Sequence, residues 1–282
     1  MTIRPVAKIT CGMPASDGAG VRMTRILGTP DAQMFDPFLM LDHFDSAESS
    51  DYLAGFPDHP HRGFETVTYM LQGRMKHADN TGREGVIETG GVQWMRAGKG
   101  IVHSEMPIQT EGRMRGFQLW VNLPGRLKMS EPDYQEFDAG QMPVEERPGG
   151  VQVKVVAGAT AAGTASPVGG GAVEARYFDV TLPAGARFDE PLPSDLNAML
   201  VVYEGAVRVA GTRIEALGAV FLGEGDEAAV EGEADARFLL IAGRPIGEPV
   251  AWAGPFVMNT QSRPHQRQGD QKDSPLPDRF TQ

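Results

Sequence analysis

The sequence predicts an all-β protein, and three observations lead to that class. Its 282 residues include 35 glycines and 21 prolines with 41% apolar residues, a composition that suits turn-rich β structure better than helices. Short runs of β-branched and aromatic residues recur and end in glycine, asparagine or aspartate, which favour turns. Two pairs of metal-ligand residues also have the i, i+2 spacing of a strand face. The length suffices for two domains.

The first half of the chain contains several short strand patterns. Residues 65–71 are rich in threonine, valine and tyrosine, and residues 76–82 end in the Asp-Asn-Thr-Gly chemistry of a hairpin turn. Residues 86–88 and 92–95 give two further short strands. We expect these strands to be antiparallel and to form a small β-barrel.

The second half repeats this strand-rich character after a boundary. Residues 124–150 resemble a linker in their proline and glycine content, with one short strand at 134–137. Residues 159–171 are rich in small residues, and we expect a mobile loop there. The strands predicted beyond the boundary cover residues 151–157, 175–182, 198–203, 206–209 and 237–242.

Four residues carry the chemistry that the sequence predicts. His59 and His61 lie two apart, and so do His103 and Glu105. On strands, that spacing sends both members of a pair to one face, so two strands can direct four ligand atoms at one point. Three imidazoles and a carboxylate suit a divalent first-row metal and leave two positions of an octahedral ion open for catalysis. Histidines of the surface or core are the less favoured reading, because both motifs are flanked by glycines.

Other candidate residues have plainer explanations. His43 and His77 are isolated histidines, for which packing or turn roles are favoured, with His43 a candidate neighbour of the pocket. Arg62 follows a ligand, and strand alternation turns it to the opposite face. The six carboxylates of residues 224–235 predict a solvated loop and strand face rather than a second cation site.

Longer motifs resemble one family, the pirins of the cupin superfamily. The resemblance rests on Phe-Pro-Asp-His-Pro-His-Arg-Gly-Phe-Glu-Thr-Val-Thr-Tyr at 56–69 and Gly-Val-Gln-Trp-Met-Arg-Ala-Gly-Lys-Gly-Ile-Val-His-Ser-Glu-Met-Pro at 91–107. Phe-Gln-Leu-Trp-Val-Asn-Leu-Pro at 117–124 and Gly-Pro-Phe-Val-Met-Asn-Thr at 254–260 extend it. It covers nearly the whole chain, from about residue 2 to Thr260.

The resemblance implies a bicupin, that is, two tandem cupin β-barrels. We expect a metal-binding N-terminal domain at 1–135, a C-terminal domain without metal ligands at 136–260 and a disordered polar tail at 261–282. The family pattern assigns one metal per chain to His59, His61, His103 and Glu105. Fe(II) is the expected ion, with Mn, Ni, Cu, Co and Zn as alternatives. Glu65 lies outside this ligand set and is expected beside it.

Two functions follow from the resemblance. The first is a metal-dependent dioxygenase that uses O₂ to cleave flavonols such as quercetin, as bacterial pirin-like quercetin 2,3-dioxygenases do. Glu105 would then accept the flavonol proton as general base, and Phe64, Trp94 and Met106 would form an apolar wall. The alternative is a non-catalytic, redox-responsive regulator that acts through a protein partner.

Composition limits the remaining classes. A net charge of −11 argues against direct binding of nucleic acid, which needs cations to neutralise phosphates. We expect no signal peptide and no membrane span. The single cysteine, Cys11, excludes an intrachain disulfide and fits a cytoplasmic location. The tail departs from the pirin pattern, since its prolines at 264, 275 and 277 prevent a continuous helix.

Overall fold

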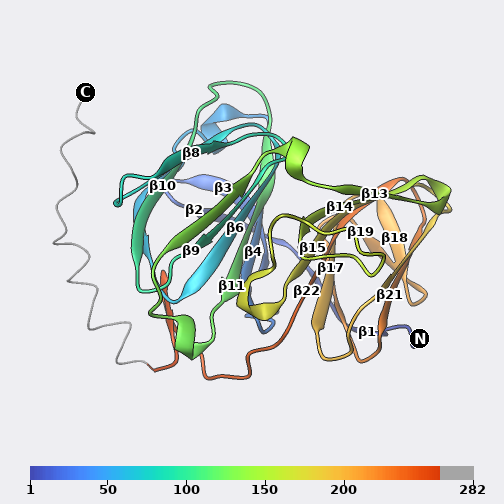
Figure 1. The fold of residues 1–282 in the computed structure, drawn as a ribbon. Coiled ribbons are helices and arrows are strands. Elements are labelled where there is room, and N and C mark those ends of the chain that lie inside the picture. The colour runs from blue at the N-terminus through green and yellow to red at the C-terminus, as the bar shows by residue number, and fades with distance from the viewer. Residues whose placement is uncertain (261–282) are drawn as a thin grey trace. The chain divides into compact units, whose positions relative to one another are not determined.

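The computed structural model describes residues 1–260 and shows a protein built almost wholly of β-strands (Figure 1). The all-β prediction is therefore confirmed. The only helical segments in this range are five 3-10 turns of three residues each, and none is a helix that could span a membrane. The prediction of a disordered tail at 261–282 lies outside the described residues.

The chain forms two compact units that are not consecutive halves of the sequence. Unit 1 comprises 1–14, 24–42 and 137–246, and unit 2 comprises 15–23, 43–136 and the segment from Gly247 onward. The predicted domains meet once, after residue 135, and one boundary between the two units falls after Glu136. Residues 1–14 and 24–42, which precede this position, nevertheless belong to the same unit as 137–246. Short strand patterns carry no information about such a distant partner.

Unit 1 contains a seven-stranded sheet in the order β1-β20-β17-β22-β15-β14-β13 and a four-stranded sheet in the order β16-β21-β18-β19. These strands are β1 (Val6–Cys11), β13 (Val144–Arg147), β14 (Val151–Ala157), β15 (Arg176–Leu182), β16 (Arg187–Pro191), β17 (Asn197–Glu204), β18 (Ala206–Val209), β19 (Thr212–Glu215), β20 (Gly218–Leu222), β21 (Glu227–Gly232) and β22 (Ala236–Gly243). All five strands predicted beyond the boundary are present among them. Strand β1 pairs antiparallel with β20 and forms the sheet edge.

The interior of unit 1 is an apolar cluster, to which Phe178, Phe188, Val220 and Phe238 contribute fully buried side chains. No histidine occurs in the residues of this unit. The acidic stretch contributes β21, whose Glu231 pairs with Arg187 across the strands, in line with a solvated strand face. Because unit 1 contains no histidine, it cannot form a second site of three imidazoles.

The loop at 159–171 is irregular, as its composition predicts, but it is held at several points. The buried Thr160 hydroxyl donates to Glu145, and the Ala161 N–H donates to Glu190 at 2.7 Å. The side chain of Val168 is fully buried. These anchors are contacts with residues outside the loop, which small-residue composition does not reveal, and the mobility of the loop stays a prediction.

Unit 2 is built around a four-stranded sheet in the order β5-β10-β7-β8 and a seven-stranded sheet in the order β12-β9-β6-β11-β4-β3-β2. Strands β2, β3 and β4 continue across the division between the units. The strands are β2 (Met13–Asp17), β3 (Val21–Leu27), β4 (Phe38–Ser46), β5 (Phe56–His61), β6 (Phe64–Gln72), β7 (Met75–Asp79), β8 (Glu84–Ile87), β9 (Val92–Arg96), β10 (Ile101–Pro107), β11 (Met114–Asn122) and β12 (Asp133–Phe137), with a separate pair β23 (Ala251–Ala253) and β24 (Phe256–Met258).

The turn predicted at 76–82 joins β7 to β8 as a hairpin. The Asp79 carboxylate accepts the N–H groups of Thr81 at 2.7 Å and Arg83 at 3.1 Å, which is the usual role of aspartate in a turn. Gly82 supplies the positive φ of +87° that the turn needs. Local turn chemistry therefore decides this hairpin.

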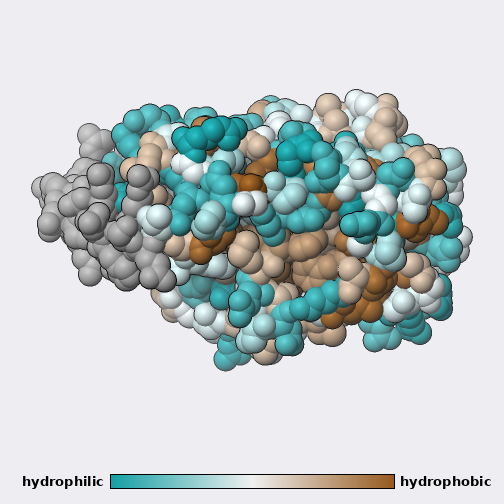
Figure 2. All heavy atoms as spheres, turned by 90° about the horizontal axis from the view of Figure 1, so that it is seen from below, coloured by the Kyte–Doolittle hydropathy of each residue, from teal (hydrophilic) through white to brown (hydrophobic). Residues whose placement is uncertain are grey.

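The surface is mixed. Figure 2 shows one face, on which hydrophilic residues predominate and hydrophobic residues gather in smaller patches. Scattered exposed apolar residues are normal on soluble proteins. Within residues 1–260, Trp252 is the most exposed aromatic residue, at 37%.

Candidate metal centre

Strands β5 and β10 bring three histidines together. The two strands pair antiparallel, with His59 opposite His103 and His61 opposite Ile101. The ring centroids lie 4.7 Å apart for His59 and His61, 4.5 Å for His59 and His103, and 5.0 Å for His61 and His103. One ligand atom from each ring lies within 4.8 Å of the others. Three imidazole nitrogens at this spacing can converge on one ion.

Glu105 lies beside this group but is held by other partners. A register irregularity follows His103, so that Glu105 stands opposite Phe56 rather than continuing the regular pairing. The Thr68 hydroxyl donates to its Oε1 at 3.0 Å, and the Gln118 amide donates to Oε2 at 3.2 Å. The group of ligand-type atoms within 4.8 Å of one another contains the three histidines and not Glu105. Metal ligation by Glu105 therefore stays a prediction.

The protonation of the histidines suits a metal. His59 donates its Nδ1–H to the Pro57 carbonyl at 2.8 Å, because a carbonyl can only accept, so that in the neutral ring the lone pair is on Nε2. Burial, reinforced by the neighbouring imidazoles, holds the pKa values of His61 and His103 well below their usual range. Both rings are consequently neutral near pH 7.

Unpartnered nitrogens make the strongest argument for a cation. Nδ1 of His61 and both ring nitrogens of His103 are buried and have no hydrogen-bond partner within the described chain. Buried polar atoms are nearly always satisfied, and an orphan in a native structure points to a missing ion or water. The chemistry of these donors therefore fits a bound divalent metal.

The Glu105 carboxylate is buried, and burial raises its pKa against the opposing effects of His59 and the Thr68 hydrogen bond. Thr68 and Gln118 are cross-strand partners on β6 and β11, so they lie on one face of the sheet. Neither residue is among the site residues predicted from the sequence. The alternation of Gln118 and Trp120 within the 117–124 motif is the signal that could have found the second.

Aromatic rings border the histidines on one side. The Phe64 ring lies 5.0 Å from the His61 ring, and the Trp120 ring lies 5.1 Å from it. Phe64 and Trp120 are themselves 4.3 Å apart, and Trp252 lies 6.2 Å beyond Trp120. Phe64 is thus beside the site as predicted, whereas Trp120 and Trp252 were not among the predicted wall residues.

Two other predicted wall residues lie elsewhere. Trp94 stands opposite Val67 on β6, and alternation turns this pair away from the face that carries Thr68. Met106 follows Glu105 directly, and a Cβ on Gly55 would lie only 2.8 Å from the Met106 sulfur, so Met106 packs against that loop. Nearness in sequence to a motif therefore did not predict nearness to the site, because successive strand residues face opposite sides.

Glu65 also faces away from the histidines. Its Oε1 accepts from Arg96 Nε at 3.0 Å, across the β6–β9 pairing, and the strand turns it opposite to Phe64 and Thr66. Arg62 donates from Nε to the Lys99 carbonyl. Neither side chain contributes to the metal group.

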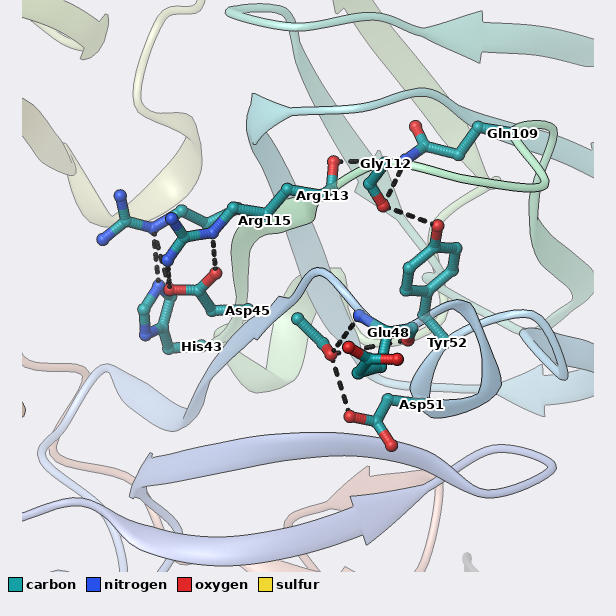
Figure 3. Close-up of polar contacts among 10 residues, drawn as sticks. His43, Asp45, Glu48, Asp51, Tyr52, Gln109, Gly112, Arg113 and Arg115 are labelled. Carbon is teal, nitrogen blue, oxygen red and sulfur yellow. Dashed lines mark hydrogen bonds and ion pairs between the residues drawn. The ribbon is translucent and has the colours of Figure 1, made fainter.

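The isolated histidines have partners of their own. Figure 3 shows the His43 ring beside the side chains of Arg113 and Arg115, which converge on the Asp45 carboxylate. His43 stacks on Phe117 with ring centroids 4.5 Å apart. These contacts give His43 the packing role that the sequence favoured.

His77 is buried on β7 opposite Glu105. Its Nε2 is hydrogen-bonded to Glu136, and its ring stacks on Tyr134 with centroids 5.6 Å apart. This hydrogen bond is the main cause of the lowered pKa of the Glu136 carboxyl. The burial, the hydrogen bond to Glu136 and the stack on Tyr134 agree with the packing role predicted for His77, while its buried Nδ1 has no partner within residues 1–260.

Comparisons with known proteins agree with this geometry. The family model Pirin matches residues 20–121, and the Pirin C-terminal cupin domain matches 177–273. A pirin-like protein of Caulobacter vibrioides is 72% identical over 93% of this chain and 95% of its own, and a pirin of Rattus norvegicus is 42% identical over 87% and 84%. The crystal structure of quercetin 2,3-dioxygenase from Acinetobacter baumannii superposes with a TM-score of 0.87 at 32% identity, covering 96% of this chain and 97% of that one. The bicupin prediction is confirmed, and the chain belongs to the pirin family.

Proposed function

We propose that this pirin is a metal-dependent dioxygenase that opens the central ring of flavonols such as quercetin. The observation that carries the proposal is a set of buried imidazole nitrogens without partners, beside a buried carboxylate and a wall of aromatic rings. A cation site next to apolar rings suits a planar molecule that presents oxygen atoms to a metal. The solved structure of 32% identity, itself a quercetin 2,3-dioxygenase, supports this substrate class.

The ion would be held by His59, His61 and His103, with Glu105 proposed as the fourth ligand. Fe(II) is the expected ion, although an N/O ligand set of this kind also accepts Mn, Ni, Cu, Co or Zn. When bound, the metal would act as a Lewis acid toward the substrate oxygens and provide the site for dioxygen chemistry. Hydrogen bonding of His59 Nδ1 to Pro57 fixes the tautomer that presents Nε2.

Glu105 is proposed to take the proton of the flavonol 3-hydroxyl. Thr68 and Gln118 each donate to a different carboxylate oxygen, which holds the plane of the group in one orientation. A carboxylate oxygen has two lone pairs, so each still has capacity to accept a proton. Transfer of this proton to Glu105 would leave the substrate as an enolate, whose negative charge suits a cationic site.

The test is anaerobic purification with elemental analysis, followed by oxygen uptake with a panel of flavonols. We expect one metal per chain and oxygen consumption in proportion to flavonol added. Metal-loaded protein that consumes no oxygen with any flavonol would contradict the proposal. The redox-responsive regulator would then be tested by comparing the affinity of the Fe(II) and Fe(III) forms for a protein partner.

A further inference from the structure

Trp252 occupies an unusual position for a large aromatic residue. It lies on the short strand β23, near the end of the described chain, and is the most exposed aromatic residue within 1–260. With 37% of its surface exposed, Trp252 forgoes part of the apolar burial that usually stabilises an indole. The exposure also occurs beside the candidate metal centre, next to Trp120.

The position of Trp252 is well determined by its surroundings in unit 2. Its indole N–H donates to the Gly254 carbonyl at 2.8 Å. The hairpin that follows is tied down through Val257, whose N–H donates to Arg62 and whose carbonyl accepts from Lys128 Nζ at 3.0 Å. A side chain placed this firmly is preorganised to receive a ligand rather than free to collapse onto the surface.

A row of rings connects Trp252 to the metal centre. The Trp120 ring lies 5.1 Å from His61, and the Trp252 ring lies 6.2 Å from Trp120, inclined at 39°. The distance between the Trp252 and His61 rings is therefore at most the sum of these two distances. A planar molecule of several rings can span a separation within this limit when its chelating end lies at the histidines.

We infer that Trp252 is a specificity-determining residue, which stacks on the ring of a polycyclic aromatic substrate farthest from the metal. The inference rests on the proposed function and extends it from the metal-binding end of the substrate to its remote end. Trp120 borders the histidines and contacts any ligand there, whereas Trp252 selects for ligands long enough to reach it. Aromatic pairs of this kind contribute beyond the area they bury.

The experiment compares two probes that share a chelating group and differ in length. Quercetin and maltol both carry a 3-hydroxy-4-keto unit on a pyrone ring, but maltol lacks the additional aromatic rings. Binding of each is measured by calorimetry under anaerobic conditions to the full chain loaded with Zn²⁺. The variants are Trp252→Ala, Trp252→Phe and the control Val144→Ala, which alters a comparably exposed apolar residue of unit 1.

Trp252→Ala should weaken quercetin binding about tenfold and leave maltol binding and zinc content unchanged. Trp252→Phe should restore most of the affinity, and Val144→Ala should match the wild type. Unchanged quercetin affinity in Trp252→Ala, or an equal loss for both probes, overturns the inference while the proposed function stands. Wild-type protein that binds neither probe overturns the proposed function and the inference with it.

Discussion

The buried lysine of unit 2 offers a prediction whose size can be worked out from its contacts. Lys128 is 1% exposed, and its Nζ donates to the Gly63 carbonyl at 2.8 Å, to Asn122 Oδ1 at 2.6 Å and to the Val257 carbonyl at 3.0 Å. Replacing it with methionine removes three charge-assisted hydrogen bonds. Asn122 Oδ1 keeps the N–H of Leu123, but the two carbonyls lose the donor that the structure gives them.

The expected loss in the free energy of unfolding is the difference between two effects. Two unsatisfied carbonyls and one lost bond to a charged group together cost about 4–9 kcal/mol. Against this, burial lowers the pKa of Lys128 from 10.5 to about 8, so removing the ammonium relieves about 3 kcal/mol. We therefore expect Lys128→Met to lower the free energy of unfolding by about 3 kcal/mol at pH 7.

The lowered pKa also predicts the pH dependence. Between pH 8 and 10.5 the unfolded state binds more protons at Lys128 than the folded state, so the folded state gains stability as the pH rises. Below pH 8 both states are protonated and the penalty of the buried charge is fully present. The stability difference between wild type and Lys128→Met should thus widen by about 2 kcal/mol from pH 7 to pH 9.5.

Urea unfolding followed by tryptophan fluorescence measures this, because Trp94, Trp120 and Trp252 all belong to unit 2. A chelator keeps every sample metal-free. The matched control is Lys76→Met, which removes a half-exposed lysine paired with Glu84 and should change stability by less than about 0.5 kcal/mol. A loss in Lys128→Met no larger than the control's, or a difference that does not vary with pH, would refute the reasoning.

Three further predictions concern the metal ligand His61, the carboxylate of Glu105 and the backbone at Gly63, for which Gly82 is the control. His61→Ala should lose high-affinity metal binding, while its urea midpoint stays near that of the metal-free wild type. Elemental analysis that finds one equivalent of metal per chain in the variant, or two in the wild type, would contradict this. Glu105→Gln should retain metal but lose turnover by roughly 10²–10⁴-fold in oxygen uptake, and wild-type turnover in the loaded variant would exclude the carboxylate from proton transfer. Gly63→Ala should destabilise unit 2 by more than about 2 kcal/mol in urea, since φ is +83° and the new Cβ would lie 1.9 Å from the Val257 carbonyl oxygen. Gly82 has φ +87° and open space around it, so Gly82→Ala introduces backbone strain without a clash and should lower the free energy of unfolding by about 1 kcal/mol. Equal losses of stability in the two variants would show that the structure relieves the clash in Gly63→Ala.

The sequence predicted those parts of the structure that depend on local order. The i, i+2 spacing placed His59 and His61 on one face, and the Asp-Asn-Thr-Gly turn placed the β7–β8 hairpin. Both follow from strand geometry and turn chemistry within a few residues. The same rule of alternation, had it been applied to Trp94 and Met106, would have removed them from the predicted wall.

The remainder depends on contacts between distant segments. The register irregularity after His103 changes what Glu105 faces, and no residue pattern announces it. Trp252 lies beside Trp120 although the two residues are far apart in the sequence. Lys128 Nζ is surrounded by three oxygens, and those of Gly63 and Val257 come from distant segments. Tertiary packing decides such placements, and the order of residues along a strand does not predict it.

The pairing of β1 with β20 has a consequence for biosynthesis. The ribosome releases the first strand of unit 1 long before Gly218–Leu222, the only partner that the sheet order gives it. A nascent chain must therefore carry this strand without its partner while the residues of unit 2 up to Glu136 are synthesised, and the sheet of unit 1 can close only after β20 has been made. A fragment limited to 137–246 would likewise leave the β20 edge bare, and bare edges template aggregation. Strand β1 thus makes completion of this sheet depend on two segments that the ribosome synthesises far apart in time.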